Sequence, residues 1–188
     1  MIVWVDVEST GLDPKRDHLL EVALVVTDDA LNEVAYTGVV MQPVGVDIDS
    51  IKMDAVVEKM HTENGLFEEV RLTRGRRHIA EERLRDWLSA VVRDMFSSDE
   101  KLDRVPLAGS TVGFDRAFLR EHMPALESMF SYRSIDVSSI TELAKRWAPA
   151  IYEKRPKAGK AHRALADVRE SIEYLRFYRR EKFIDVQP

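Results

Sequence analysis

Two acidic residues interrupt the first apolar segment of the sequence. Asp6 and Glu8 lie in and just after the β-branched segment 2–7, which predicts a buried strand. Residues two apart on a strand point to the same face, so both carboxylates project together. Two such carboxylates repel each other unless a cation lies between them, and Mg²⁺ prefers oxygen ligands. The alternative is that both acids lie in water at a strand end and bind nothing.

Three further polar residues come next to apolar segments later in the chain. Asp115 lies in the first turn of an expected helix, where an acid also favours the helix dipole. His162 precedes the last expected helix, and Asp167 lies on that helix in a stripe of small side chains. A histidine has a reference pKa of about 6.5 and can act as a general base at neutral pH. A helix-start acid and a solvent-exposed histidine are the structural alternatives.

Together these residues match the needs of phosphodiester hydrolysis. The four carboxylates of Asp6, Glu8, Asp115 and Asp167 carry a charge of −4, which two divalent cations offset. Two cations about 3.5–4 Å apart are the usual arrangement for in-line displacement at phosphorus. The sequence contains no G-x-S-x-G, H-E-x-x-H, P-loop or G-x-G-x-x-G motif. Zinc-peptidase and P-loop triphosphatase chemistry therefore lack their signatures.

The elements that must position these residues fall into two groups. We expect strands over 2–7, 19–27 and 34–42 as an antiparallel meander, with a turn at Asn32. Farther along we expect helices over 51–60, 79–95, 114–119, 140–147 and 165–175, short strands over 105–109 and 134–137, and loops over 97–104 and 152–160. Strands followed by interleaved strands and helices predict an α/β fold, a three-layer mixed sheet flanked by helices.

Length and composition predict one domain over residues 1–188. Hydrophobic residues make up 45% and charged residues 32%, which is typical of a globular chain with a heavily solvated surface. There is no cysteine, which excludes disulfides, thiolate nucleophiles and cysteine-ligated metals and favours a cytoplasmic protein. We find no signal-peptide pattern, and the longest apolar run near the start is far shorter than a membrane span of about 18 residues.

The net charge of −5 argues against a protein that coats long nucleic acids. Two bound divalent ions would add +4 and leave about −1. A short oligonucleotide needs few phosphate contacts, so it stays compatible with this charge. We interpret the basic clusters 74–77 and 179–182 as solvated faces, whereas the basic loop 154–160 leads into His162 and is better placed to contact phosphate.

Several motifs resemble those of a known enzyme family. They are Asp6-x-Glu8 followed by Thr-Gly-Leu, Asp115 in a Gly-x-Asp context, His162-x4-Asp167, and Tyr132-Arg133-x-x-Asp136-Val137-Ser138. The catalytic set resembles the DEDDh group of 3′–5′ exonucleases, which have an RNase H-like fold. The Tyr-Arg-x-x-Asp-Val-Ser segment narrows the resemblance to oligoribonucleases, over residues 3–184.

This resemblance implies two-metal-ion hydrolysis of RNA of two to five nucleotides, with dinucleotides favoured, to nucleoside 5′-monophosphates. The implied metal ligands, for two Mg²⁺ or Mn²⁺ ions, are Asp6, Glu8, Asp115 and Asp167, and His162 is the implied general base. The implied substrate-binding residues are Leu12, His61, Ser110, Phe114, Tyr132, Arg133 and Ser138. The family forms homodimers, in which Tyr132 and Arg133 would reach the partner's site.

The sequence also departs from the family pattern. Val56 replaces a substrate-stacking tryptophan, Phe114 a glutamine, Ser110 an asparagine and Ser9 a methionine. Stacking of a base on an aromatic ring contributes about 1–3 kcal/mol, so these departures bear on substrate range more than on activity. Two alternatives are a DEDDh exonuclease of broader range, on DNA or longer RNA ends, and a non-catalytic nucleotide-binding protein. The intact acids and His162 count against the second.

Overall fold

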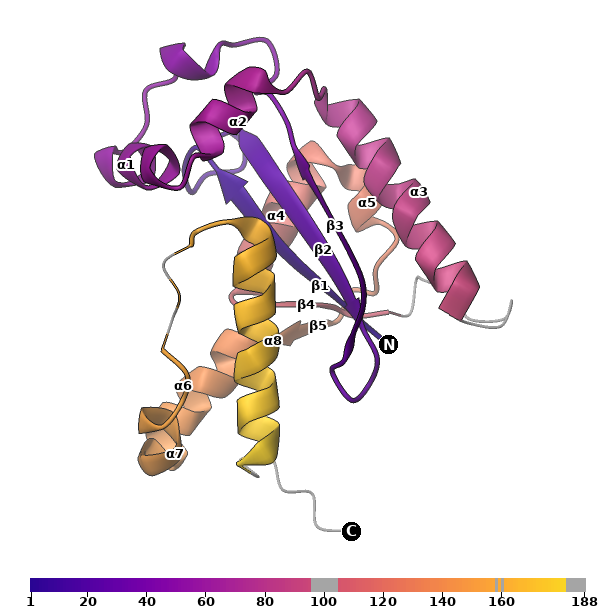
Figure 1. Ribbon diagram of the computed structural model, residues 1–188, viewed down its shortest axis with the longest axis vertical. Coiled ribbons are helices and arrows are strands. Elements are labelled where there is room, and N and C mark those ends of the chain that lie inside the picture. Colours follow the sequence, from indigo (N-terminus) through magenta and orange to yellow (C-terminus); the bar gives the residue numbers. More distant parts are fainter. Residues whose placement is uncertain (96–104, 158, 160, 182–188) are drawn as a thin grey trace.

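A five-stranded mixed sheet forms the centre of the computed structural model (Figure 1). The structure describes residues 1–95, 105–157, 159 and 161–181. The strands are β1 (Ile2–Ser9), β2 (Leu19–Thr27), β3 (Glu33–Val40), β4 (Leu107–Gly109) and β5 (Ser134–Asp136), in the order β3-β2-β1-β4-β5. The first three strands pair antiparallel, and β4 and β5 run parallel to β1. The predicted meander is confirmed.

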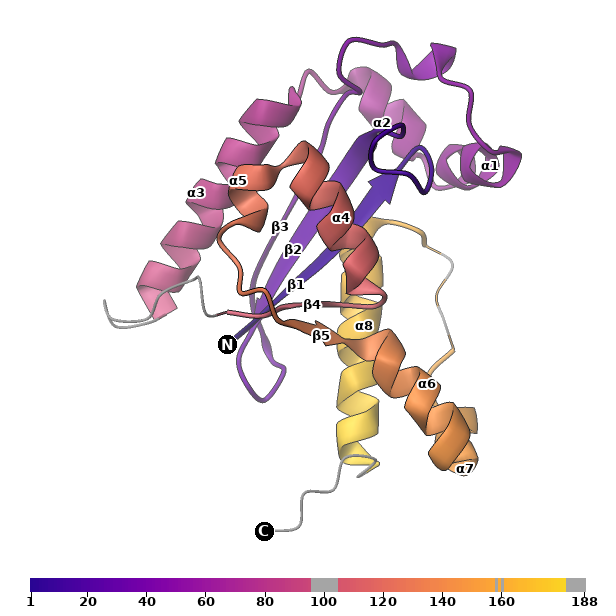
Figure 2. The same cartoon turned by 180° about the vertical axis from the view of Figure 1, so that it is seen from behind.

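Helices cover both faces of this sheet. One face carries α3 (Arg77–Met95), α4 (Val112–His122) and α5 (Pro124–Glu127), and the other carries α6 (Val137–Trp147) and α8 (Ala164–Arg180) (Figures 1 and 2). Beyond one end of the sheet lie α1 (Ala55–Glu63) and α2 (Leu66–Leu72), and α7 (Pro149–Glu153) follows α6. The three-layer arrangement is confirmed.

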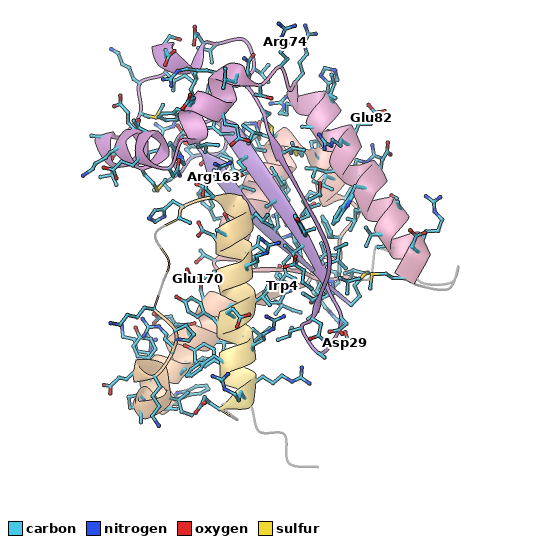
Figure 3. All side chains as sticks on the ribbon, viewed as in Figure 1. Trp4, Asp29, Arg74, Glu82, Arg163 and Glu170 are labelled. Carbon is cyan, nitrogen blue, oxygen red and sulfur yellow. The ribbon has the colours of Figure 1, made fainter. Side chains whose placement is uncertain are left out.

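The alternation of side chains along β1 decides which face carries the acids. Val3, Val5 and Val7 are buried in the core cluster that includes α3 and α4. Trp4 points to the opposite face, in the cluster that includes α8, and its indole Nε1 donates to Thr27 Oγ1 at 3.0 Å (Figure 3). Because side chains alternate along a strand, Asp6 and Glu8 share the face of Trp4. Both acids therefore point toward α8.

Several boundaries differ from the sequence prediction. The helix expected over 51–60 begins at Ala55, because the Asp54 carboxylate caps it by accepting from Val56 N, and a one-turn 3₁₀ helix (Ile48–Ser50) precedes it. The third strand ends at Val40, two residues early, since Gln42 N donates to Gly75 O instead of to a neighbouring strand. Gly65, at a positive φ of 78°, separates α1 from α2, which the sequence patterns missed.

The later elements also shift slightly. The sixth helix starts at Val137, because the Asp136 carboxylate accepts from Ser138 N and ends the short strand there. The expected loop 152–160 begins later, since Tyr152 and Glu153 form the last turn of α7. Residues 158 and 160 of that loop, the loop expected over 97–104 and part of the basic cluster 179–182 lie outside the described residues.

Within the residues that the structure describes, no helix is both long and apolar enough to span a membrane.

Candidate active site

Three carboxylates converge between the sheet and α8. Asp6 and Glu8 come from β1, and Asp167 comes from the first turn of α8. One oxygen of each carboxylate lies within 4.8 Å of the others. Glu8 is buried and the other two are half-buried, so solvent does little to screen the three charges from one another. The structure brings together three of the four acids that the sequence singles out.

A fourth carboxylate, that of Asp115, approaches the same place from the other side of β1. Asp115 lies in the first turn of α4, is buried, and accepts a hydrogen bond from the backbone N of Val7 at 3.0 Å. That bond ties α4 to the strand segment between Asp6 and Glu8. Asp115 lies outside the tight group of three, but its charge is among those that repel Asp6.

Burial and mutual repulsion make this cluster hard to ionise. Burial, with repulsion from Asp115 and Glu8, raises the pKa of Asp6 to about 9. Burial, with repulsion from Asp167, raises the pKa of Glu8 to about 8. Burial also raises the pKa of Asp115 to about 7, against the backbone hydrogen bonds that lower it, and the pKa of Asp167 to about 6.

The cluster suits a divalent cation for the same reason. Its donors are all carboxylate oxygens, the ligands that Mg²⁺ and Mn²⁺ prefer. A cation among them would reverse the repulsion that raises their pKa values and hold all of them ionised. The residues present therefore fit a hard metal ion.

His162 stands at the junction between the preceding loop and α8. It is exposed, precedes the first residue of the helix and has a positive φ of 43°, which is uncommon for a residue other than glycine. The side-chain amide of Asn64 donates to the His162 carbonyl oxygen. Burial raises the pKa of Asp167, and an electrostatic interaction with His162 acts against that rise, so the imidazole is coupled to the acid cluster.

A cavity of about 510 Å³ lies against His162. It is lined by Val56, Lys59, Met60, Glu63, Asn64, Ala161 and His162. Val56, at the position where the resemblance implies a tryptophan, is 74% exposed on this wall. The cavity therefore presents an apolar side chain and a cation next to the candidate base, on a scale that suits a small ligand.

His61 lies next to Glu8 of the acid cluster. Its ring is fully buried, with Nε2 2.9 Å from the Ser9 carbonyl oxygen and 3.9 Å from Glu8 Oε2, and it packs edge-on to Phe67. A carbonyl oxygen only accepts, so Nε2 carries the hydrogen. Burial lowers the pKa of His61, which keeps the ring neutral. In this conformation the imidazole contacts protein on all sides.

The other predicted substrate-binding residues occupy varied positions. Leu12 is 80% exposed in the turn after β1. Ser110 lies 2.8 Å from Ser171 through their hydroxyl groups, one helical turn from Asp167. The half-buried ring of Phe114 packs 4.9 Å from that of Phe118. The hydroxyl of Ser138 lies 3.0 Å from that of Thr111, at the loop before α4.

Tyr132 and Arg133 lie at the far end of the sheet. The backbone N of Ser131 donates to Val105 O. Ser134 of β5 pairs with Leu107 of β4, which pairs with Val3 of β1, so these three residues lie side by side across the sheet. At about 3.3 Å per residue, Tyr132 is therefore roughly 16 Å back along the strand direction from Asp6. Tyr132 is 83% exposed, and the Arg133 guanidinium lies over its ring at 5.5 Å. The structure does not bring this pair to the acids of its own chain.

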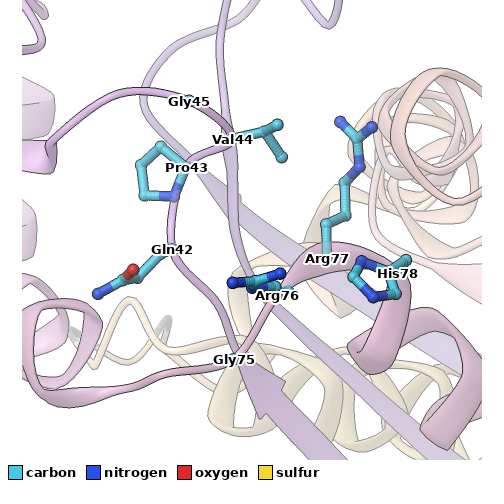
Figure 4. A pocket seen from close by; sticks show the side chains of 8 residues that line it. All are labelled: Gln42, Pro43, Val44, Gly45, Gly75, Arg76, Arg77 and His78. Atoms are coloured by element: carbon cyan, nitrogen blue, oxygen red, sulfur yellow. The ribbon is translucent and has the colours of Figure 1, made fainter.

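A second cavity, of about 420 Å³, is lined in part by the basic cluster 74–77. It lies between the end of β3 and the start of α3 and is lined by Gln42, Pro43, Val44, Gly45, Gly75, Arg76, Arg77 and His78 (Figure 4). Arg77 Nη1 lies 3.1 Å from His122 Nδ1, whereas Arg76 and His78 are exposed. Its lining includes none of the clustered acids, so it is separate from the candidate active site.

Comparison with known proteins agrees with this geometry. The RNase_T exonuclease family model matches residues 3–175. The chain is 43% identical to an oligoribonuclease of Corynebacterium glutamicum and 44% identical to one of Mycobacterium avium, each over 97% of this chain and 80% and 81% of the relative. The chain belongs to the oligoribonuclease family. Its enzyme class is therefore that of a 3′–5′ exoribonuclease, as predicted.

A solved structure supports the fold independently of sequence. The zinc-bound form of the E. coli ExoI–ssDNA complex superposes with a TM-score of 0.71 at 14% identity. The superposition covers 96% of this chain and 40% of that one, so this chain spans about two fifths of its length. The predicted RNase H-like α/β fold is thereby confirmed.

Sequence reasoning missed two charged residues beside the oligoribonuclease-type acids. Glu21 is only 7% exposed in β2, directly opposite Glu8 in the strand register. Arg163 forms ion pairs with both Glu21 and Glu69. The signal was available, because Glu21 is an acid inside the apolar segment LLEVALVVT, just as Asp6 is in its own strand.

Proposed function

We propose that this chain is a metal-dependent exonuclease that hydrolyses RNA of two to five nucleotides, dinucleotides first, to nucleoside 5′-monophosphates. The observation that carries the proposal is the convergence of Asp6, Glu8 and Asp167, with Asp115 beside Asp6. Burying four acids in one place is costly for a fold and is typical of a site that binds cations. Membership of the oligoribonuclease family supplies the substrate class.

We assign Asp6, Glu8, Asp115 and Asp167 as ligands of two Mg²⁺ or Mn²⁺ ions. When bound, such ions neutralise the carboxylates, orient the phosphate and stabilise the oxygen that leaves. The protein's part is to hold the four oxygen donors on rigid elements. Asp6 and Glu8 are fixed by the sheet, and Asp115 is fixed by its bond from Val7 N.

We assign His162 as the general base. A ring nitrogen of the imidazole takes a proton from water as the new P–O bond forms at the 5′-phosphate of the terminal nucleotide. The bond from that phosphorus to O3′ of the preceding nucleotide breaks, and the departing O3′ takes up a proton from solvent. Exposure of His162 lets that proton pass on to solvent after each turnover. The adjoining cavity, with Val56 and Lys59, would receive part of the nucleotide.

We propose that the working form is a homodimer in which Tyr132 and Arg133 close the partner's site at the 5′ end of the RNA. Two observations support this. By the strand register, Tyr132 lies roughly 16 Å and Arg133 roughly 13 Å back from Asp6 in its own chain, farther than an arginine side chain extends. The exposed Tyr132 ring and its arginine offer stacking and a phosphate contact to a second chain. The cytoplasmic location stays a prediction.

Labelled RNA and DNA of two, five and twenty nucleotides, each with Mg²⁺ or Mn²⁺, test the substrate range. We expect the dinucleotide RNA to be hydrolysed fastest and the 20-mer slowest. Equal rates at all lengths would contradict the short-substrate proposal and favour an exonuclease of broader range. Asp6→Ala should abolish hydrolysis of every substrate, and an Asp6→Ala protein as active as the parent would contradict the catalytic assignment.

A further inference from the structure

We propose that Glu21, acting through Arg163, is a positioning residue that holds His162 in place beside the acid cluster. The inference rests on the proposed function, because it takes His162 to be the general base. It adds two residues, Glu21 and Arg163, that stand outside the set implied by family resemblance. Three features carry it: the burial of Glu21, the contacts of Arg163 and the backbone conformation of His162.

Glu21 has a placement that needs a partner. It lies opposite Glu8 on the neighbouring antiparallel strand, so the two carboxylates share one face of the sheet. Like charges directly across a sheet destabilise it, and an unpaired buried carboxylate is costly. Glu21 also repels Asp6 and Asp167. A fifth acid at this site therefore persists only with a compensating cation.

Arg163 is that cation. Its Nε and Nη2 donate to the two oxygens of Glu21 at 3.0 and 3.1 Å, and Nη2 also donates to Glu69 at 2.6 Å. Figure 3 shows Arg163 at the end of α8 nearest to α2. Hydrogen bonds to Glu21 raise the pKa of Arg163, and the arginine charge in turn lowers the pKa of Glu8.

Glu21 also supplies the cap of α8. Arg163 occupies the N-cap position, and its own side chain makes no capping bond. The backbone N of Ala164, the first residue of the helix, donates instead to Glu21 Oε2 at 3.2 Å. A strand carboxylate thus does from a distance what a local serine or aspartate usually does at a helix start. This contact fixes the start of the helix that carries Asp167 against β2.

His162 immediately precedes this anchored pair. Its positive φ of 43° is strained for a residue with a side chain, so the surrounding contacts must impose it. Asn64 holds the His162 carbonyl from one side, while Glu21 holds the next two residues from the other. Without Glu21 the junction loses one of these two anchors, and we expect the imidazole to sample orientations away from Asp167.

A second ion pair on the same helix provides a matched control. Arg169 of α8 donates to both oxygens of Glu33 of β3, at 3.0 and 2.8 Å. This pair links helix to sheet with the same chemistry as Arg163 and Glu21, and its glutamate, on β3, is hydrogen-bonded to Arg169 and not to the start of α8. Glu33→Gln therefore measures the loss of one such pair without any effect on His162.

The experiment compares Glu21→Gln with Glu33→Gln on a dinucleotide substrate at saturating Mn²⁺. We expect kcat of Glu21→Gln to fall by about ten-fold or more, the range seen when a group that orients a site residue is removed. We expect KM to stay within about two-fold of the parent, because the cavity lining is unchanged. The Glu33→Gln variant should keep the parent's kcat.

Arg163 variants keep the proposal testable should Glu21→Gln fold poorly. Arg163→Met should lose kcat as Glu21→Gln does, and Arg163→Lys should recover part of it. The double variant Glu21→Gln/Arg163→Met should lose no more than the worse single variant, since both act through one contact. Losses that multiply in the double variant would contradict the inference.

Two further results would overturn the proposal, and one more would contradict its premise. If kcat of Glu21→Gln stays within about two-fold of Glu33→Gln, Glu21 does not position His162. If Mn²⁺ raised above the concentration that saturates the parent restores full activity to Glu21→Gln, Glu21 acts on the metal site and not on His162. If His162→Ala retains the parent's kcat, the general-base assignment itself fails, independently of Glu21.

Discussion

Asp6 and Glu8 lie in a strand whose other residues are almost all apolar and buried. At the scale of single residues, burying these two carboxylates lowers the stability of the fold, although the proposed function requires them. Carboxylates in such a place cost stability unless a cation or a donor compensates them. Here Val7 N partly compensates Asp115, whereas burial and then repulsion from the neighbouring acids all raise the pKa of Asp6. The remaining compensation is left to bound cations.

This conflict predicts how the metal-free protein responds to pH. Folding raises the pKa of Asp6 to about 9, of Glu8 to about 8, of Asp115 to about 7 and of Asp167 to about 6. The folded state therefore holds these protons more tightly than the unfolded chain. Their contribution to the free energy of unfolding is largest below about pH 4 and is lost as pH rises through about 6 to 9.

We expect the midpoint of thermal unfolding in EDTA to fall between pH 6 and 9, and added Mg²⁺ to remove most of that fall. Asp6→Asn in EDTA should show a smaller fall than the parent, since one of the raised groups is gone. A midpoint that falls equally steeply with pH in EDTA and in Mg²⁺ would contradict this interpretation.

At the scale of single elements, the helix α1 forms one wall of the proposed substrate site. The helix α1 presents Val56 to the cavity beside His162, at the position where the resemblance leads one to expect a stacking tryptophan. A valine offers apolar contact but no ring. The helix itself is well placed, because Asp54 caps its start and Asn64 joins its end to His162.

Restoring the ring tests this interpretation. We expect Val56→Trp to lower KM for a dinucleotide by about five-fold or more, since stacking on an aromatic contributes about 1–3 kcal/mol per base. Leu72→Trp, which changes an equally exposed apolar residue on α2 outside this cavity, is the matched control and should leave KM unchanged. A KM for Val56→Trp equal to that of Leu72→Trp would show that α1 does not contact a base.

Another element-scale device is the Asp136 carboxylate. It caps α6 by accepting from Ser138 N at 2.9 Å and also accepts from Thr111 N at 3.0 Å, where Thr111 has a positive φ of 57° before α4. One side chain thus fixes the starts of two helices.

We expect Asp136→Ala to lower the free energy of unfolding by about 1–2 kcal/mol in a urea titration, the range for loss of a capping residue. Asp54→Ala removes the cap of α1 alone and should cost less than Asp136→Ala. Equal costs for the two variants would argue that the bond to Thr111 adds nothing.

At the scale of the whole molecule, the position of Tyr132 and Arg133 makes oligomeric state part of the proposed mechanism. A site completed by a second chain can be reconstituted from two defective chains. His162→Ala lacks the proposed base but keeps Arg133, and Arg133→Ala has the reverse defect.

We expect each of these variants alone to be weakly active and their mixture, after subunit exchange, to regain roughly a quarter of the parent's activity. Random pairing gives half mixed dimers, each with one complete site of two. Sedimentation before and after mixing checks that dimers form. A mixture no more active than its components would show that Arg133 does not serve the partner's site.

The charged residues illustrate how far prediction from sequence reached. Asp6, Glu8 and Asp167 were recognised because acids stand out in apolar segments and on small-residue stripes, and the structure brings them within 4.8 Å. Glu21 stands out by the same criterion and was missed, since its partner Arg163 is 142 residues away. No local pattern signals such a pairing. The helix α2 was missed because only two residues, Asn64 and Gly65, separate it from α1.

Local chemistry by itself determined the strands, the longer helices, the candidate metal ligands and the absence of thiol chemistry, because side-chain type and period depend only on neighbours along the chain. Contacts between distant segments decided the rest. Tertiary structure alone joined Glu21 to Arg163, put Asn64 on His162, and set Tyr132 far from its own acids. The free energy of burying a charge depends on which groups surround it, and that is settled only when the chain has folded.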